Sequence, residues 1–436
     1  MGDAPRPEPL YRPQDDGTIV VYVGDLVVGG EDGSTSTVRG QLELTFSPRS
    51  TLTAHFAGSF STVGRASWLS AGHERGVTIP EGASLAPPSE RLSFERPDGE
   101  RSWVDDQIWP ESITAGELDR AERFMFHLSS GFEPEFRVQR GVSKAGINFE
   151  LPGWTLVAAA TTDERRADES DFGGVVEAVP TEAPTQEGIE RLRNRLYVLL
   201  SLAAGREIGI APVCGLDAKG TVVWGEWGAP RLRLGKSTAW WCPPLLIPAV
   251  LPELARGYVP IVEDRALEPV AHRALDHLLA ADSPEVLDVR IPVACSGLEL
   301  LSWGVLRRHG WLDQDSFQQL TAAAKTRLLL QWAEIPTAIP ENFHALIARR
   351  DRLQQTHGEA PEILFNVRNG LIHPPRRLDD PEWPTLDELI EAWQFSTWAL
   401  QLALLRLLGY ADHYWSRLRL GRSALSVEPV PWAAEA

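Results

Sequence analysis

The sequence predicts an α+β protein in which a β-rich N-terminal region precedes an all-α C-terminal bundle. Residues 17–165 hold short β-branched and aromatic runs separated by Gly, Pro, Asp and Ser, as in the strands of a sandwich or barrel. Within residues 261–422, apolar residues instead recur at helical spacing, and Asp, Asn or Thr often precedes each run. A chain of 436 residues has room for two or three such domains.

The predicted strands of the N-terminal region lie at residues 18–28, 38–47, 50–60, 135–141 and 154–162. Residues 1–16 are rich in proline and are expected to form a flexible arm. The acidic, proline-containing stretch 166–187 predicts a linker or a long loop. Residues 188–260 follow as a mixed α/β segment that could pack on the β-domain, with an amphipathic helix ended by Gly205 and two or three strands after it.

The C-terminal region contains about six predicted helical segments, at residues 269–282, 291–310, 315–334, 342–358, 360–373 and 385–410. Short connections favour antiparallel packing of consecutive helices, so an up-and-down bundle is expected. Residues 423–436 are expected to form a tail.

Composition limits the kind of function. A net charge of −18 counts against a generic nucleic-acid-binding protein, which carries basic residues to neutralise phosphates. From Val286 to Arg422, however, 15 Lys and Arg face 16 Asp and Glu, a balance of −1. Four arginines of this region are candidates for binding a phosphate backbone: Arg349, Arg350, Arg376 and Arg377. The alternative is that they are ordinary surface residues of an arginine-rich chain.

The cysteines and the apolar runs make further exclusions. Cys214, Cys242 and Cys295 are odd in number and widely spaced, which argues against a disulfide framework or a structural zinc site. Phosphate-binding loops, nucleophile elbows and His-Glu-x-x-His pairs are absent from the sequence, so neither a metal nor a cofactor is expected. Without a secretory signal or an apolar run of ~20 residues, the expectation is a cytoplasmic protein with no membrane contact.

The block ILFNVRNGLIHPP, residues 363–375, carries the chemistry-bearing residues Arg368, Asn369 and His373. Six other Arg/His pairs in the chain have similar spacing, so spacing alone is not informative. The context distinguishes this block, because apolar residues at helical spacing place the polar trio on a mostly buried helix. Charged groups in that position need partners or a function.

On a helix, Asn369 and His373 share a face, and Arg368 lies about 100° around from Asn369. Proline at position 374 disfavours the helical conformation for His373, so the imidazole is expected where the helix ends. Histidine suits general acid or base work near neutral pH, and arginine suits an anionic transition state. Glu299 lies in an apolar run, and we expect its buried partner to be Arg368.

This block resembles the signature of HEPN ribonucleases, helical RNA-cutting domains with an arginine, a small polar residue and a later histidine. The resemblance implies a metal-independent endoribonuclease that cuts RNA through its 2′-hydroxyl, with Arg368, Asn369, His373 and Glu299 as catalytic residues. It also implies a homodimer that joins two motifs across one cleft. More loosely, a β-rich region ahead of such a bundle resembles ApeA-type anti-phage proteins, which implies a sensor or regulator for a phage-derived or host trigger.

Three alternatives remain open at the level of sequence. The bundle could be a catalytically silent dimerisation scaffold, with a β-domain that binds a ligand or a protein. The protein could be a toxin silenced by a separately encoded partner. The motif itself could be structural, because a helix C-terminus favours histidine and an Arg–Glu pair can hold two helices together.

Overall fold

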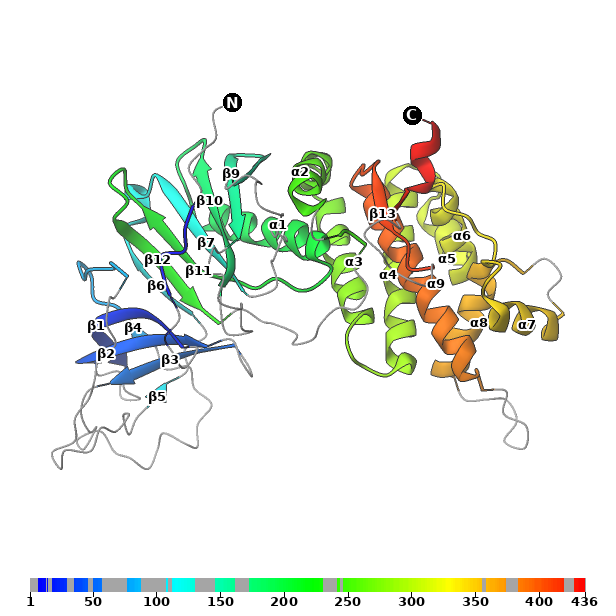
Figure 1. Ribbon diagram of the computed structural model, residues 1–436, viewed down its shortest axis with the longest axis horizontal. Helices are drawn as coiled ribbons and strands as arrows, with labels where there is room; N and C mark the ends of the chain where they lie inside the picture. The colour runs from blue at the N-terminus through cyan, green and yellow to red at the C-terminus, as the bar shows by residue number, and fades with distance from the viewer. Residues whose placement is uncertain are drawn as a thin grey trace, which may run out of the picture. The chain divides into compact units, whose positions relative to one another are not determined.

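The computed structural model describes residues 7–12, 14, 18–29, 35–45, 50–56, 77–87, 107–108, 112–129, 146–160, 172–229, 241–243, 246–354, 358–373, 383–418 and 427–435. The chain forms two compact units (Figure 1). The β unit consists of residues 1–200 and 207–234, and the helical unit of residues 201–206 and 235–436. The predicted α+β class and its order along the chain are confirmed.

The β unit contains two antiparallel sheets. The smaller has the order β4 (Val77–Thr78), β1 (Ile19–Gly29), β2 (Thr35–Thr45), β3 (Thr51–Phe56), β5 (Gln107–Ile108). The larger has the order β6 (Ser112–Gly116), β12 (Val222–Gly228), β11 (Ile210–Leu216), β7 (Arg123–Ser129), β10 (Phe172–Pro180), β9 (Trp154–Ala160), β8 (Ile147–Leu151). Four of the five predicted strands are confirmed, and the fifth, 135–141, lies outside the described residues.

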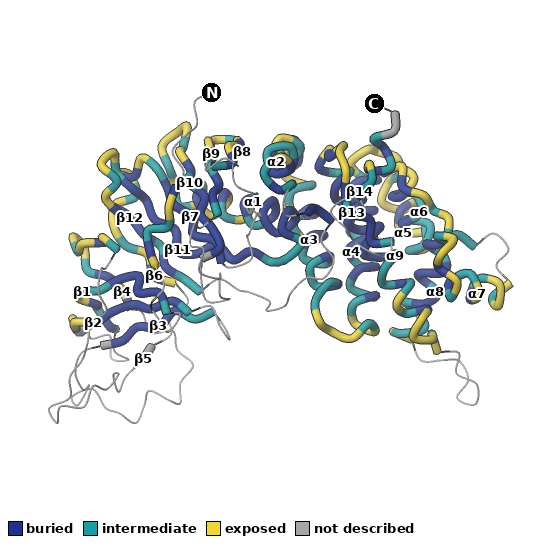
Figure 2. Tube along the Cα trace, viewed as in Figure 1, coloured by how far each residue is buried: buried dark blue, intermediate teal, exposed yellow. Residues whose placement is uncertain are grey.

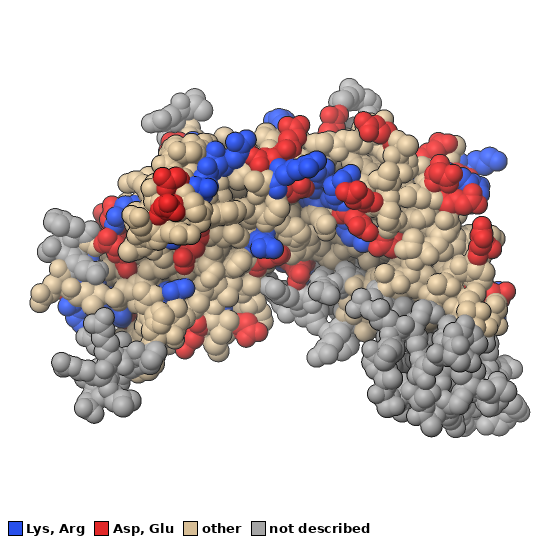
Figure 3. Space-filling view, turned by 180° about the vertical axis from the view of Figure 1, so that it is seen from behind, with Lys and Arg blue, Asp and Glu red and all other residues tan. Residues whose placement is uncertain are grey.

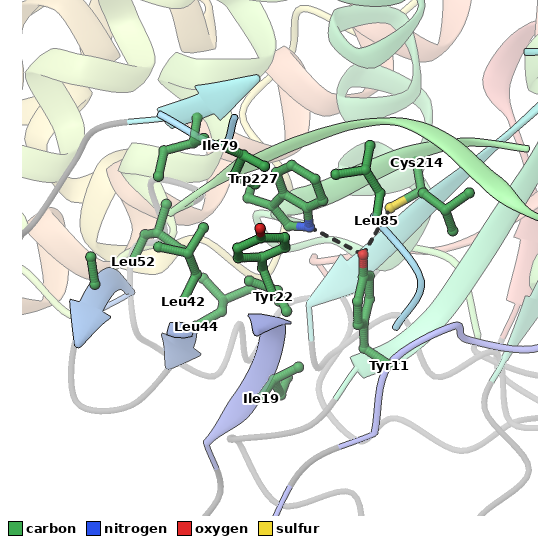
Figure 4. Packing of buried hydrophobic residues seen from close by; sticks show 14 of the residues in the cluster. Tyr11, Ile19, Tyr22, Leu42, Leu44, Leu52, Ile79, Leu85, Cys214 and Trp227 are labelled. Carbon is green, nitrogen blue, oxygen red and sulfur yellow. Dashed lines mark hydrogen bonds between the residues drawn. The ribbon is translucent and has the colours of Figure 1, made fainter. Parts of the chain in front are cut away.

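The two sheets share one core, as the sheets of a sandwich do. Alternation along β2 points Leu42 and Leu44 into this core, where Trp227 of β12 is also buried (Figure 4). Tyr11 lies in the same core, and its hydroxyl bonds with Trp227 Nε1 at 3.1 Å and Cys214 Sγ at 3.2 Å. The predicted flexible arm is therefore wrong for residues 7–12, because an aromatic residue among the prolines anchors them.

The other face of the large sheet is covered by α1 (Gln186–Ala204). Arg193 of this helix pairs with Glu226 of β12 at 2.7 Å, and the apolar side of α1 is buried. The predicted helix and strands of residues 188–260 are confirmed up to β12, and these strands belong to the large sheet itself. The predicted acidic linker is wrong for residues 172–180, which form β10 between β7 and β9. The apolar residues of β10 are flanked by acidic and proline-rich sequence, so the composition of the whole stretch hides the strand.

The helical unit contains α2 (Ile247–Glu263), α3 (Leu267–Ala281), α4 (Leu287–Arg308), α5 (Gln314–Gln319), α6 (Ala322–Trp332), α7 (His344–Arg352), α8 (Ala360–Ile372) and α9 (Leu386–Leu407). It begins before the predicted boundary at residue 261, because α2 forms despite Pro252 and Pro260. The predicted helix 315–334 is two helices, since Leu320 is extended and Thr321 caps α6.

The predicted tail is wrong for residues 427–435. β14 (Val427–Pro429) pairs with β13 (His413–Trp415), and a short 3₁₀ helix, η3 (Pro431–Glu435), follows. The indole of Trp432 is buried, and its Nε1 donates to the Tyr410 carbonyl at 2.6 Å. One buried aromatic side chain therefore anchors the end of the chain to the residues that follow α9.

α4 is the central helix of this unit (Figure 2). It packs closely against α3 at Gly304 and against α9 at Gly297, where added methyl groups would clash with Val270 and Leu400. Of the described helices, it alone has the length and apolar character to cross a membrane, but 56% of the relevant window is buried inside the protein. That burial is what a core helix shows.

α4 and α9 run parallel. Arg290 near the start of α4 lies over the Trp393 ring of α9 at 4.0 Å, and further along Gly297 faces Leu400. From the first contact to the second, the residue numbers increase along both helices. The N-termini of α4 and α9 therefore lie at the same end of the helical unit.

His127 on β7 is fully buried in the β unit. Its Nδ1 lies 2.9 Å from the Pro212 carbonyl oxygen, and its Nε2 accepts a hydrogen bond from the Leu10 N–H at 3.1 Å. Burial lowers the pKa of His127 to about 4, and the hydrogen bond to Pro212 opposes this shift. Protonation would remove the lone pair that accepts from Leu10.

We expect His127 to destabilise the β unit as the pH falls from about 6.5 to about 4. In that window the unfolded chain binds a proton at this histidine and the folded chain does not, which costs about 3 kcal/mol of unfolding free energy. Urea unfolding at several pH values, compared with His127→Gln, isolates the contribution. If both proteins lose stability equally over this window, His127 is not responsible.

Candidate functional site

The motif helix α8 forms where the sequence predicts it. Glu359 is its extended N-cap residue, Pro361 lies in its first turn, and its apolar stripe is buried. The helix ends before His373, which is extended with φ −115° and ψ 136° and donates its N–H to the Asn369 carbonyl at 3.0 Å. The expectation that the following proline places His373 at the helix end is confirmed.

Arg368 faces α4. Its Nη2 lies 3.9 Å from Glu299 Oε1, so the predicted pairing is observed, although as a long contact. The side chains are 23% and 32% exposed, so the pair borders solvent and is not enclosed as expected. Nη1 donates to the neighbouring Asn369 Oδ1 at 3.1 Å, and Nε is buried with no hydrogen-bond partner among the described residues. The guanidinium therefore keeps hydrogen-bonding capacity.

Asn369 and His373 lie at the surface on the exposed end of α8. The structure thus brings Arg368, Asn369 and Glu299 together, and it places His373 on the turn that follows. Cys295, one turn before Glu299 on α4, is buried, and burial raises the pKa of its thiol, so it is not a nucleophile here. No group of three or more His, Cys, Asp or Glu side chains arranged to hold a metal occurs in the described part of the chain.

The four candidate RNA-binding arginines have different outcomes. Arg350 is partly exposed and bonds to Asp351 Oδ1 at 2.8 Å. Arg376 and Arg377 lie outside the described residues. Arg349 contradicts the prediction, because its side chain is only 6% exposed and pairs with Glu388 at 2.7 Å. It is a buried structural residue and not a surface cation.

The Arg349–Glu388 pair holds three helices together. Arg349 of α7 donates through Nε to Asn366 Oδ1 of α8 at 2.8 Å, while Glu388 of α9 also accepts from Arg352 at 2.5 Å. Burial tends to raise the pKa of Glu388, but hydrogen bonds from Arg352, the Thr385 amide and Arg349 hold it below its ordinary value. The α7 sequence is polar, and the partner Glu388 is distant in the chain, so no local pattern indicates that Arg349 is buried.

Exposed apolar side chains gather at the end of the helical unit where α8 terminates. The N-termini of α4 and α9 share this end, and Gly370 of α8 lies beside Pro384, just before α9 (Figure 1). The exposed residues, which we call the apolar end, are Val286, Val289, Ile372, Trp383, Leu386 and Ile390. Large exposed apolar groups in one region indicate an interaction surface. Sequence periodicity alone did not separate them from core residues.

Comparisons with known proteins cover this unit. Residues 264–428 match the family model "YopA C-terminal domain". The match is less than half of the chain, and it contains Glu299, Arg368, Asn369 and His373. The chain is also 26% identical over 246 residues to the "SPbeta prophage-derived uncharacterized protein YopA" of Bacillus subtilis (strain 168), which is 56% of this chain and 53% of that protein. The chain thus spans about half the length of this relative, and no solved structure matches.

We expect Glu299→Gln to change the unfolding free energy by less than about 1 kcal/mol. The Arg368–Glu299 contact is long and partly exposed, and such pairs contribute about 0–1 kcal/mol. Urea unfolding measures this directly. A loss of several kcal/mol would mean that the pair fastens α4 to α8 and that its role is structural.

Proposed function

We propose that the helical unit is a metal-independent endoribonuclease that acts as a homodimer, with the β unit as sensor or regulator. The observation that supports this most is the position of Arg368 and His373. Both are accessible, both belong to one helix end, and a carboxylate stands beside the arginine. A guanidinium suits the phosphate, and an imidazole suits proton transfer, in cleavage by the 2′-hydroxyl of RNA.

In the proposed reaction, His373 takes the proton of a 2′-hydroxyl, and the 2′-oxygen then attacks the adjacent phosphorus. Arg368 donates hydrogen bonds to the phosphate oxygens, where negative charge increases in the transition state. Asn369 and Glu299 orient the guanidinium. The 5′-oxygen leaves with a proton supplied by His373 of the partner subunit, which yields a 2′,3′-cyclic phosphate and a 5′-hydroxyl.

The apolar end supports the homodimer. It carries six exposed apolar residues at the end of the helical unit where α8 terminates, and in the proposed dimer two copies join there and bring their His373 side chains to one cleft. The face in Figure 3 shows basic and acidic side chains interspersed. In the proposed dimer, Arg368 of each protomer holds the phosphate. We further propose that the protein is a cytoplasmic anti-phage or toxin effector; the name of the Bacillus subtilis protein to which it is similar describes that protein as prophage-derived.

The test uses the purified full-length chain with single-stranded RNA in excess EDTA. We expect cleavage products with 2′,3′-cyclic phosphate and 5′-hydroxyl ends, and a rate about 10²–10³-fold lower for Arg368→Ala. Arg406→Ala, which removes a surface arginine paired with Glu334, is the matched control. An intact dimer that leaves RNA uncut would contradict the nuclease and favour the silent scaffold.

A further inference from the structure

α4 presents a line of chemically distinct residues that leads away from the Arg368–Glu299 pair. Glu299, Trp303 and Arg307 are spaced four apart, so they lie on one side of the helix with a rise of about 6 Å between neighbours. The indole of Trp303 is 42% exposed, although it belongs to the central helix of the unit. An exposed aromatic side chain therefore lies one helical turn from the candidate catalytic carboxylate.

The line continues beyond the end of α4. Arg307 is partly buried and fixed by a hydrogen bond from Nη1 to the Leu312 carbonyl at 3.2 Å. Two residues later, the His309 ring contacts two tryptophans, with its centroid 6.0 Å from that of Trp311 and 5.9 Å from that of Trp332. Trp311 is 55% exposed. Trp303 and Trp311 are thus exposed, and in the sequence they lie four residues before and four residues after Arg307.

This combination matches the chemistry of unpaired nucleic acid. Aromatic faces stack on bases without regard to sequence, and an arginine between them interacts with the backbone. Duplex RNA hides its base faces within the stack, so it could not use these indoles. A membrane surface would require the tryptophans to flank an apolar band, whereas here they flank a charged residue.

We propose that Trp303 and Trp311 form a base-stacking track for single-stranded RNA that begins at the Arg368–Glu299 pair. This inference rests on the proposed ribonuclease function and specifies its substrate as an unpaired strand. Trp303 stacks the base beside the cleaved phosphodiester, and Trp311 stacks a base further along the strand. Both act as positioning residues and not as catalytic ones.

The test measures binding separately from cleavage. A single-stranded 2′-O-methyl oligouridine cannot be cut through a 2′-hydroxyl, so its dissociation constant does not depend on catalysis. Trp303→Leu is expected to raise this constant about 5- to 100-fold, since base stacking contributes about that much per aromatic residue. Trp303→Phe keeps a stacking face and is expected to stay within about threefold of the unchanged protein.

Trp311→Leu and Trp311→Phe should repeat this pattern, and a duplex of the same length should bind equally to all variants. Unchanged oligouridine binding by both leucine variants would overturn the proposal and leave the indoles as a protein-binding surface. Equal losses in the leucine and phenylalanine variants would also overturn it, because packing and not stacking would then be responsible. If only the leucine variants lose oligouridine binding and the protein cuts no RNA, the stacking track is supported and the ribonuclease function is rejected.

Discussion

Replacing His373 by alanine is expected to lower the rate of RNA cleavage by about 10²–10⁴-fold, the range that general acid–base catalysis contributes. The imidazole is exposed at the end of α8, and the hydrogen bond that closes the helix there uses only the backbone N–H. The substitution should therefore leave the fold intact. Initial rates on a labelled single-stranded RNA, with circular dichroism as the folding check, measure this effect.

His344→Ala is the matched control, because His344 is also an exposed histidine at the end of a helix. The rate of RNA cleavage by this variant should equal that of the wild-type protein. Because the proposed reaction takes its base from one protomer and its acid from the other, mixed dimers of His373→Ala and wild-type chains should also lose most of the activity. A His373→Ala protein that cuts RNA at the normal rate would exclude this histidine from the chemistry.

Glu388→Ala is expected to destabilise the helical unit by about 3–5 kcal/mol. The substitution leaves the Arg349 guanidinium buried without its carboxylate, and breaking a buried pair on one side costs about this much. It also removes the Glu388 side chain from the capping box at the start of α9. Because Arg349 bonds to Asn366 of α8, the motif helix should lose protection as well.

Urea unfolding gives the free energy, and amide hydrogen exchange shows whether α8 opens first. Glu334→Ala is the control, since Glu334 pairs with Arg406 at the surface and its removal should cost less than about 1 kcal/mol. Equal effects of the two substitutions would mean that Glu388 does not hold the helices together.

Local sequence was sufficient to predict much of the fold. The helices of the C-terminal region and four strands of the N-terminal region have strong periodicity, which depends only on neighbouring residues. The errors occur where distant residues decide the outcome. Tyr11 is ordered by Trp227 and Cys214, and β10 is a strand because β7 and β9 flank it.

The candidate site was likewise predicted only in part. The helix end at His373 follows from the adjacent proline, so the sequence predicts it correctly. The Arg368–Glu299 contact was also predicted, because a carboxylate in an apolar run needs a partner. The prediction of a surface cation is wrong for Arg349, because its partner Glu388 lies 39 residues away and nothing local indicates the pairing.

The hydrogen bond between Trp227 and Tyr11 joins residues 216 positions apart. During synthesis the Tyr11 segment leaves the ribosome long before the strand that completes its binding site. At about 5–20 residues per second, this interval is about 10–40 s. The sandwich core can close only after that interval, so the apolar residues of the β unit stay exposed on the nascent chain until Trp227 has emerged.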